Sequence, residues 1–317
     1  LQHMTADDEA YVQEVSGGAP GTASTASKMI APDICVITSI GEGHLSRMGT
    51  IENVIRGKMQ ITDGLKPGGV LIVNDDNEYL HAQTPDVTTI RYSLSNPDCD
   101  YRARNIRGTD RGVEFEIVSP DGVFDASIAL RGNHNVSNAL AAFAAGHVAG
   151  IPAHRIIAGM SRYRPSSDRQ NIIDVGGYTI LLDAYNSNVL SMTAALETLV
   201  TLPVREGGRR IVVMGDMGEQ GDKVEENHAL IGNRISALPV DQLYCVGEGS
   251  LHTARSAAAK GTSVVHRATA AELVLAVRDV DKGARVAAGL TGRTEVRALD
   301  LADLSSVRAF AQGWDGP

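Results

Sequence analysis

The sequence is poor in aromatic residues and lacks long apolar runs. Phe, Trp and Tyr make up only 4% of the 317 residues, so Val, Ile, Leu and Ala must fill the cores. The length suits two domains rather than one. No apolar run approaches the ~20 residues of a membrane span, which argues against a protein embedded in a membrane.

Paired cysteines and an excess of positive charge are also missing. Cys35, Cys99 and Cys245 are far apart and odd in number, which indicates a reducing cytoplasm rather than a disulfide framework. The 29 Lys and Arg residues face 38 Asp and Glu residues, a formal net charge of −9. This balance disfavours nucleic acid or an anionic membrane as a partner. We therefore expect a cytoplasmic protein that binds neither.

A phosphate-binding P-loop is absent as well. Such a loop has the form G-x-x-G-K-[ST], with its Lys directly after the second Gly. The stretch GAPGTASTASK (18–28) has a similar composition, but Lys28 lies seven residues after Gly21. We interpret this stretch as a loop that enters a helix ending before Pro32.

The pattern that is present in the first half alternates apolar strands with helices, which predicts a parallel sheet covered by helices. The elements expected in this half, in chain order, are a strand at 11–15, a helix at 24–29, a strand at 34–39, a helix at 50–63 and a strand at 70–74. Between 100 and 130, short strands separated by turn sequences predict a small antiparallel insert. An Ala-rich helix follows at 135–148.

A polar segment at 163–171 separates this half from a second alternation, which predicts a Rossmann-like domain. The elements expected there are strands at 178–182, 210–214, 242–246 and 262–265, helices at 189–202, 225–237 and 251–259, and a helix opening on the capping box Thr269 to Glu272. The fold class is therefore α/β. We place a central domain at 1–167 and a Rossmann-like C-terminal domain at 168–317.

Two polar residues follow the first strands. Glu14 ends the strand at 11–15, and His44 lies in a glycine-flanked loop after the strand at 34–39. Ligands of parallel sheets collect beyond the carboxyl ends of the strands, where both residues would lie. Taken alone, however, each is also typical of a solvated surface loop.

Several ordered motifs resemble the Mur ligase family, and its MurF-type branch most closely. They extend from about Tyr11 to about Val246. The motifs are YVQEVSGG (11–18), PDICVITSIGEGHLSRMGTIENVIRGKMQI (32–61), NDDN (74–77), YRARNIRGTDRGVEFEI (101–117), LRGNHNVSNALAAFAAG (130–146), ILLDAYNSNVLSMTAALETL (180–199) and VVMGDMGEQG (212–221). The resemblance implies an ATP-dependent ligase that activates a carboxylate as an acyl phosphate, for attack by an amine. Its implied cofactors are ATP and Mg²⁺.

The resemblance also implies a metal site. Glu14, His44 and Lys58 match the family's metal-site positions, and we expect His44 and Lys58 to act in catalysis. In several members the matching Lys carries a carbamate, which turns an ammonium into a group that accepts a cation. An unmodified Lys58 would instead meet a phosphate or repel the metal, and an ordinary surface lysine remains an alternative.

Further positions resemble the family's nucleotide site. His134 and Asn135 match the start of the adenine-contacting helix, although these residues would also serve as plain helix caps. Arg169 matches an Arg that reaches the phosphates, and Asp183 matches an Asp that meets the ribose region. The remaining residues expected at the same nucleotide site are Tyr185, Asn186 and Asn188.

The sequence also departs from the family's pattern. Asp168 stands where a Gly usually precedes Arg169, and VAAGLTGRTEV (286–296) stands where a KGSR-type motif is expected. The second departure suggests altered recognition of the amino-acid or peptide substrate. Asp216 and His228 complete the likeness, but glycines near Asp216 are also typical of a simple strand-to-helix turn.

We expect one subunit of a split amide ligase that acts on a small carboxylate and an amine. A P-loop-containing Mur ligase-like partner subunit would supply the phosphate loop, because an uncovered strand edge in the first 40 residues invites a partner or a homo-oligomer. Two alternatives stay open: a catalytically inactive scaffold protein, and a fragment of an ordinary full-length ligase.

Overall fold

The structure, a computed structural model, describes residues 8–43, 45–164, 169–175 and 178–268, and the backbone of 275–277 and 296–298. The chain forms two compact units, the first comprising Leu1–Leu202 with Gly218–Lys223 and the second Pro203–Met217 with Val224–Pro317. The predicted domain boundary after residue 167 falls outside the described residues and stays a prediction.

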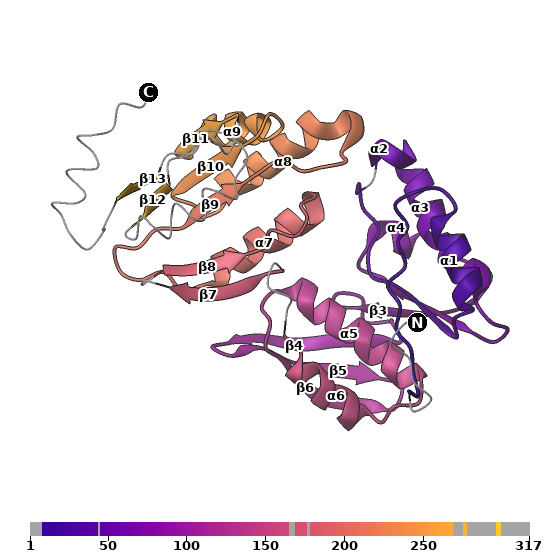
Figure 1. Ribbon diagram of the computed structural model, residues 1–317. Coiled ribbons are helices and arrows are strands. Elements are labelled where there is room, and N and C mark those ends of the chain that lie inside the picture. The colour runs from indigo at the N-terminus through magenta and orange to yellow at the C-terminus, as the bar shows by residue number, and fades with distance from the viewer. Residues whose placement is uncertain are drawn as a thin grey trace. The chain divides into compact units, whose positions relative to one another are not determined.

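A six-stranded sheet runs through the first unit within the described residues, in the order β1-β2-β3-β4-β5-β6 (Figure 1). Its strands are β1 (Ile34–Ile37), β2 (Val70–Asn74), β3 (Thr88–Ser93), β4 (Tyr101–Thr109), β5 (Gly112–Ser119) and β6 (Gly122–Ile128). Neighbours from β1 to β4 are parallel, and those from β4 to β6 are antiparallel. The predicted antiparallel insert is therefore confirmed as three strands, but it extends the main sheet because β4 pairs with the end of β3.

Helices cover both faces of this sheet. They are α1 (Thr22–Ile30), α2 (Leu45–Met48), α3 (Ile51–Met59) with a following 3₁₀ turn (Gln60–Gly64), α4 (Glu78–His81), α5 (Asn133–Val148) and α6 (Ala153–Arg162). Alternate residues of β2 enter opposite cores, because successive strand side chains point to opposite faces. Ile72 packs in the core that includes α5, whereas Leu71 and Val73 pack in the core that includes α3.

The first unit also contains the hairpin of β7 (Asn171–Val175) and β8 (Tyr178–Leu182), and helix α7 (Val189–Thr201). The sequence predicted β8 and α7 within a residue or two, but placed the linker over the start of β7. It also missed β3 and α6. No helix in the described part of the chain has the length and apolar character needed to cross a membrane.

The predicted strand at 11–15 is wrong. Residues 10–15 have no regular secondary structure, and Val12 is 93% exposed. The segment pairs with no strand of the described residues, so no ladder of hydrogen bonds holds it as a strand. Glu14 therefore lies in an irregular segment and not at the end of a strand.

The second unit has the alternation expected of a Rossmann-like domain. Its three-stranded parallel sheet has the order β11-β10-β9. The elements are β9 (Ile211–Met214), α8 (Val224–Ser236), β10 (Gln242–Val246), α9 (Ser250–Ala258) and β11 (Val264–Arg267), with a separate parallel pair of β12 (Leu275–Val277) and β13 (Val296–Ala298). The helix predicted from Thr269 begins outside the described residues, and the strand at β12 shows that it does not extend to Leu275.

Candidate functional site

Lys58 lies on α3, beside the segment that follows β1. The helix begins at the N-cap Thr50, whose side chain accepts a hydrogen bond from the Asn53 backbone N–H. Lys58 Nζ lies 3.4 Å from the Ser39 carbonyl oxygen. Burial lowers the pKa of the Lys58 ammonium below its ordinary value, because a low-dielectric environment disfavours the charged form.

The segment of Glu14 passes over the stem of Lys58. A Cβ added at Gly17 would lie 3.1 Å from Lys58 Cγ, so the backbone of Gly17 is in close contact with this side chain. Glu14 itself is exposed. The structure thus brings the Glu14 segment and Lys58 together, although they are far apart in the sequence.

The predicted metal site is only partly visible. His44 lies outside the described residues, and those that are described contain no group of three or more His, Cys, Asp or Glu side chains able to hold a metal ion. The side chains of Glu14 and of a carbamylated Lys58 would offer the oxygen ligands that Mg²⁺ prefers. The three-residue metal site therefore stays a prediction.

Side-chain amides fix the carboxyl end of β1. Asn74 Nδ2 donates to the Thr38 carbonyl at 3.0 Å, and Asn77 Nδ2 donates to the Ile40 carbonyl at 2.8 Å. From the other side, Leu190 of α7 packs against Gly41, where an added Cβ would lie 2.5 Å from Leu190 Cδ1. A side chain at position 41 would require the Leu190 side chain to shift, so this side chain of α7 contacts the loop.

The start of α5 forms a second cluster. His134 hydrogen-bonds to the Gln170 side chain, and the carboxylates of Asp183 and Glu197 are near enough to act on it electrostatically. Burial lowers the pKa of His134, while these three neighbours oppose that shift without reversing it. His134 and Asp183, which the sequence predicted for one nucleotide site, thus lie in one neighbourhood.

Gln170 is a residue that sequence reasoning missed. Its Oε1 accepts a hydrogen bond from Thr198 Oγ1 of α7 at 3.2 Å, and its φ is +47°, an uncommon value for a residue other than glycine. Gln170 therefore ties the start of α5 to α7. A single Gln after a linker has no recognisable pattern, and its position next to Arg169 was the only available signal.

Of the other residues predicted for the nucleotide site, some have exposed side chains and others have side chains hydrogen-bonded within the protein. The Arg169 guanidinium stacks over the Tyr185 ring at 3.9 Å from the centroid, an exposed cation–π pair. Asn186 is exposed. Asn135 Nδ2 donates to the Arg131 carbonyl at 2.7 Å, and its side-chain oxygen has no hydrogen-bond partner among the described residues.

Asn188 has a structural role in addition to its predicted one. Its side chain accepts a hydrogen bond from the Ser191 N–H at 2.9 Å, and its backbone N–H donates to Ser191 Oγ, so that the two residues form the capping box of α7. Asp168, the departure next to Arg169, lies outside the described residues.

Asp216 and His228 serve the second unit itself. Asp216 Oδ1 accepts a hydrogen bond from the Ser250 N–H at 2.7 Å, at the start of α9. His228 is fully buried, with Nε2 accepting from the Met217 N–H at 3.1 Å and Nδ1 bonded to Thr253 at 3.0 Å. Burial lowers the pKa of His228, which keeps the imidazole neutral. Asp216 thus connects the end of β9 to α9, and His228 connects Met217 to α8.

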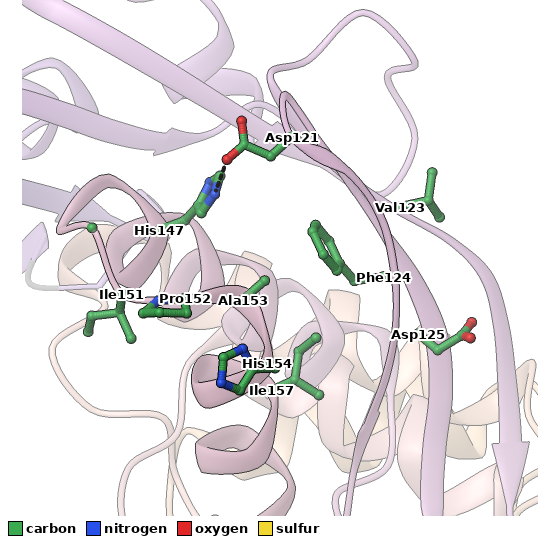
Figure 2. A pocket seen from close by; sticks show the side chains of 11 residues that line it. Asp121, Val123, Phe124, Asp125, His147, Ile151, Pro152, Ala153, His154 and Ile157 are labelled. Carbon is green, nitrogen blue, oxygen red and sulfur yellow. Dashed lines mark hydrogen bonds and ion pairs between the residues drawn. The ribbon is translucent and has the colours of Figure 1, made fainter.

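A hollow of about 660 Å³ lies between β6 and the junction of α5 and α6 (Figure 2). His147 bridges two of its neighbours at 2.9 Å each, through Nδ1 to Tyr101 and through Nε2 to Asp121. Figure 2 shows Phe124 turned toward the helices. His147 lies 14 residues after Asn133 on α5, or about 20 Å along the helix. The hollow is therefore remote from the cluster at the start of α5.

Comparisons with known proteins match most of this chain. The profile of the Mur ligase middle domain matches residues 1–146, and that of the Mur ligase glutamate ligase domain matches residues 168–288. UDP-N-acetylmuramoyl-tripeptide–D-alanyl-D-alanine ligase of Escherichia coli (strain K12) is 32% identical over 79% of this chain and 55% of its own length. The enzyme of the same name from Bacillus subtilis (strain 168) is 34% identical over 77% of this chain and 52% of its own length.

Solved structures show the same fold. A crystal structure of MurF from Acinetobacter baumannii has a TM-score of 0.72 and 25% identity, covering 89% of this chain and 59% of the other. MurF ligase from Thermotoga maritima in complex with ADP has a TM-score of 0.70 at 20% identity, covering 90% of this chain and 62% of that one. The chain spans about half the length of the curated relatives it matches. Two successive family profiles, about a third of residues identical over most of the chain and the shared α/β fold together show that this chain belongs to the Mur ligase family.

Proposed function

We propose that this chain is the nucleotide- and metal-binding part of a MurF-like ligase, which uses ATP to join a carboxylate to an amine. The observation that carries the proposal is the assembly of distant residues in the first unit. The Asp183 carboxylate is near enough to act electrostatically on His134 at the start of α5. Gly17 of the Glu14 segment contacts Lys58, which lies beside Ser39 in the loop after β1. Family membership alone supports only the reaction class.

The nucleotide residues suit a nucleoside with a charged tail. The side-chain oxygen of Asn135 accepts a hydrogen bond from an adenine amino group, and the Asp183 carboxylate accepts from ribose hydroxyls. Arg169 supplies a cation for the phosphates when it leaves the Tyr185 ring. Phosphoryl transfer depends mainly on such positioning and charge neutralisation, because little covalent chemistry is left for the protein. A bound Mg²⁺ would supply further positive charge at the phosphates.

Lys58 suits a carbamate. Its lowered pKa increases the fraction of neutral amine, the form that attacks CO₂. The new N–C bond gives a carbamate anion and releases one proton. The side chain then offers two oxygen atoms in place of an ammonium, so that it attracts a cation instead of repelling one.

The phosphate loop must come from outside these 317 residues, which contain no G-x-x-G-K-[ST] sequence. We propose a P-loop-containing Mur ligase-like polypeptide as its source, either as a separate partner subunit or as further chain of the same protein. A homo-oligomer covers an open strand edge but adds no P-loop, because each copy lacks the motif. The curated relatives are named for a tripeptide precursor and D-alanyl-D-alanine. We extend only their reaction class to this chain, amide formation between a small carboxylate and an amine.

Nucleotide binding tests this proposal without requiring turnover. The chain alone is expected to bind adenosine and ATP with affinities within about tenfold of each other, a difference of under about 1.4 kcal/mol, because the main phosphate cradle is missing. Ligand-observed NMR measures both. Asp183→Ala should weaken both ligands, whereas Asp110→Ala, at an exposed turn, is the matched control. Failure of both ligands to bind would contradict the nucleotide site and favour an inactive scaffold.

Phosphate release tests the missing loop. With ATP and Mg²⁺, the isolated chain should release essentially no phosphate. Addition of the P-loop polypeptide, together with the acid and the amine, should restore release that depends on both substrates. Robust turnover by the isolated chain would show that the proposed need for an external loop is wrong.

A further inference from the structure

Residues Gly218–Lys223, here called the clasp, hold the loop that follows β1. They belong to the first unit, although β9 before them and α8 after them belong to the second. The clasp contacts Glu42 in the loop and Ser46 and Arg47 in α2. This contact joins parts of the chain that are 181 residues apart at Glu42 and Lys223.

Two ion pairs of opposite polarity connect the clasp to the loop. Lys223 Nζ of the clasp lies 2.5 Å from Glu42 Oε1 of the loop. Arg47 Nη2 of the loop lies 2.9 Å from Glu219 Oε1 of the clasp. Because each partner carries one acid and one base, an exchanged arrangement would place like charges together. The two pairs therefore specify one orientation of the clasp on the loop.

The backbone reinforces this orientation. The Ser46 N–H donates to the Glu219 carbonyl at 3.3 Å, while Gln220 is only 2% exposed. Glu219 has a φ of +57°, a left-handed conformation that is costly for a residue other than glycine. Gly221 has a φ of +58°, and a Cβ there would lie 3.5 Å from the Ser46 nitrogen. The clasp therefore adopts a specific, close-fitting shape and is not a loose linker.

We propose that Glu219 and Lys223 are positioning residues for the proposed ligase reaction. Their partners, Glu42 and Arg47, lie on either side of His44 in the sequence, so the clasp sets the loop that contains this predicted metal ligand. The loop is already fixed at its start, where Asn77 bonds to Ile40. The clasp fixes its other end. The catalytic consequence rests on the proposed function, whereas the contact itself does not.

Hydrogen exchange tests the contact on the chain as it exists. Lys223→Glu and Glu42→Lys each place like charges together, and each should speed exchange of the Ser46 amide about three- to tenfold. The double variant, Glu42→Lys with Lys223→Glu, recreates the pair in reverse and should restore slow exchange. Lys66→Glu is the matched control, because it breaks an exposed pair with Asp33 elsewhere in the unit. The proposal would be overturned if the exchange rate of the Ser46 amide were unchanged in both single variants. It would also be overturned if exchange in the double variant remained as fast as in the single variants.

Ligase assays with the P-loop polypeptide test the catalytic role. Lys223→Glu should lower kcat and raise the Mg²⁺ concentration needed for half-maximal rate, with adenosine affinity unchanged, and the double variant should recover both. A purely structural contact would leave the Mg²⁺ dependence unaltered, which would overturn the positioning role. If the wild-type assembly has no ligase activity while the exchange rates change as expected, the proposed function is wrong. The contact between the clasp and the loop is then still supported.

Discussion

Lys58 is the predicted site residue whose chemistry the structure changes most. As a surface lysine it would be protonated and unreactive, yet burial lowers its pKa and Gly17 packs on its stem. The pattern around it in the sequence predicts only a helix. Its environment therefore supports the carbamate hypothesis in a way that the sequence did not.

The carbamate is testable directly. In buffer with ¹³C-labelled bicarbonate, the wild-type chain should show a carbamate carbon signal that Lys58→Met removes. Lys28→Met should retain the signal, because the Lys28 side chain is 63% exposed and lies 3.9 Å from Asp63. A signal that persists in Lys58→Met would assign the carbamate to another amine.

Stability should depend on pH through the same side chain. The folded-state pKa of Lys58 is lowered, so below it the native state carries the full cost of a buried ammonium. This cost fades as pH rises through the window up to the ordinary value of 10.5. In CO₂-free buffer, Lys58→Met should therefore stabilise the chain most near neutral pH, with a gain that shrinks toward pH 10.5. Urea unfolding at several pH values measures this, and a gain that grows with pH would contradict the burial argument.

The 3₁₀ turn after α3 packs directly on α1. A Cβ added at Gly64 would lie 2.2 Å from the Ser27 carbonyl oxygen, a backbone atom that has little freedom to move. Gly64→Ala should cost about 1–3 kcal/mol of unfolding free energy. Gly159→Ala in α6 is the opposite case, because an added Cβ meets no neighbouring atom within 4 Å, and this substitution should gain about 0.5–1 kcal/mol. Equal effects in urea unfolding would show that this packing is not as close as described.

Helix α7 depends on its capping box. Asn188→Ala should cost about 1 kcal/mol, because the first turn loses an acceptor for the Ser191 N–H. Asn186→Ala, at an exposed position two residues earlier, should change stability by less than about 0.5 kcal/mol. If Asn188→Ala leaves unfolding unchanged but weakens adenosine binding, its main role is in the nucleotide site.

At the level of the whole protein, the edge of the main sheet predicts association. β1 pairs only with β2 among the described strands, so its other edge is open to another strand. The chain should self-associate, or pair with the P-loop polypeptide, with slower hydrogen exchange across Ile34–Ile37 in the assembly. Light scattering and exchange on the same samples measure this. A chain that stays monomeric and does not bind the P-loop polypeptide would contradict the prediction and favour an inactive scaffold.

The sequence alone determined much of the local structure. The helix at α3 and the strand at β2 have apolar periodicities and caps that act within a few residues, so their positions follow from short stretches of chain. The ordered motifs also indicated the family, because several of them had to match in the same order. His134 and Asp183 were assigned to one site from this resemblance before any geometry was known.

Tertiary structure decided what depends on distant partners. Tyr11–Val15 has the composition of a strand but forms none, because a strand exists only beside a neighbour that completes its hydrogen bonds. β4 joined the main sheet by pairing with β3, and no local pattern specifies that choice. Gln170 came to hydrogen-bond with His134, and Lys223 met Glu42 across 181 residues, only when folding brought them together. Apolar periodicity indicates which residues of one helix or strand share a face. A site is formed by side chains from distant parts of the chain, and their spacing in the sequence does not indicate that they will meet.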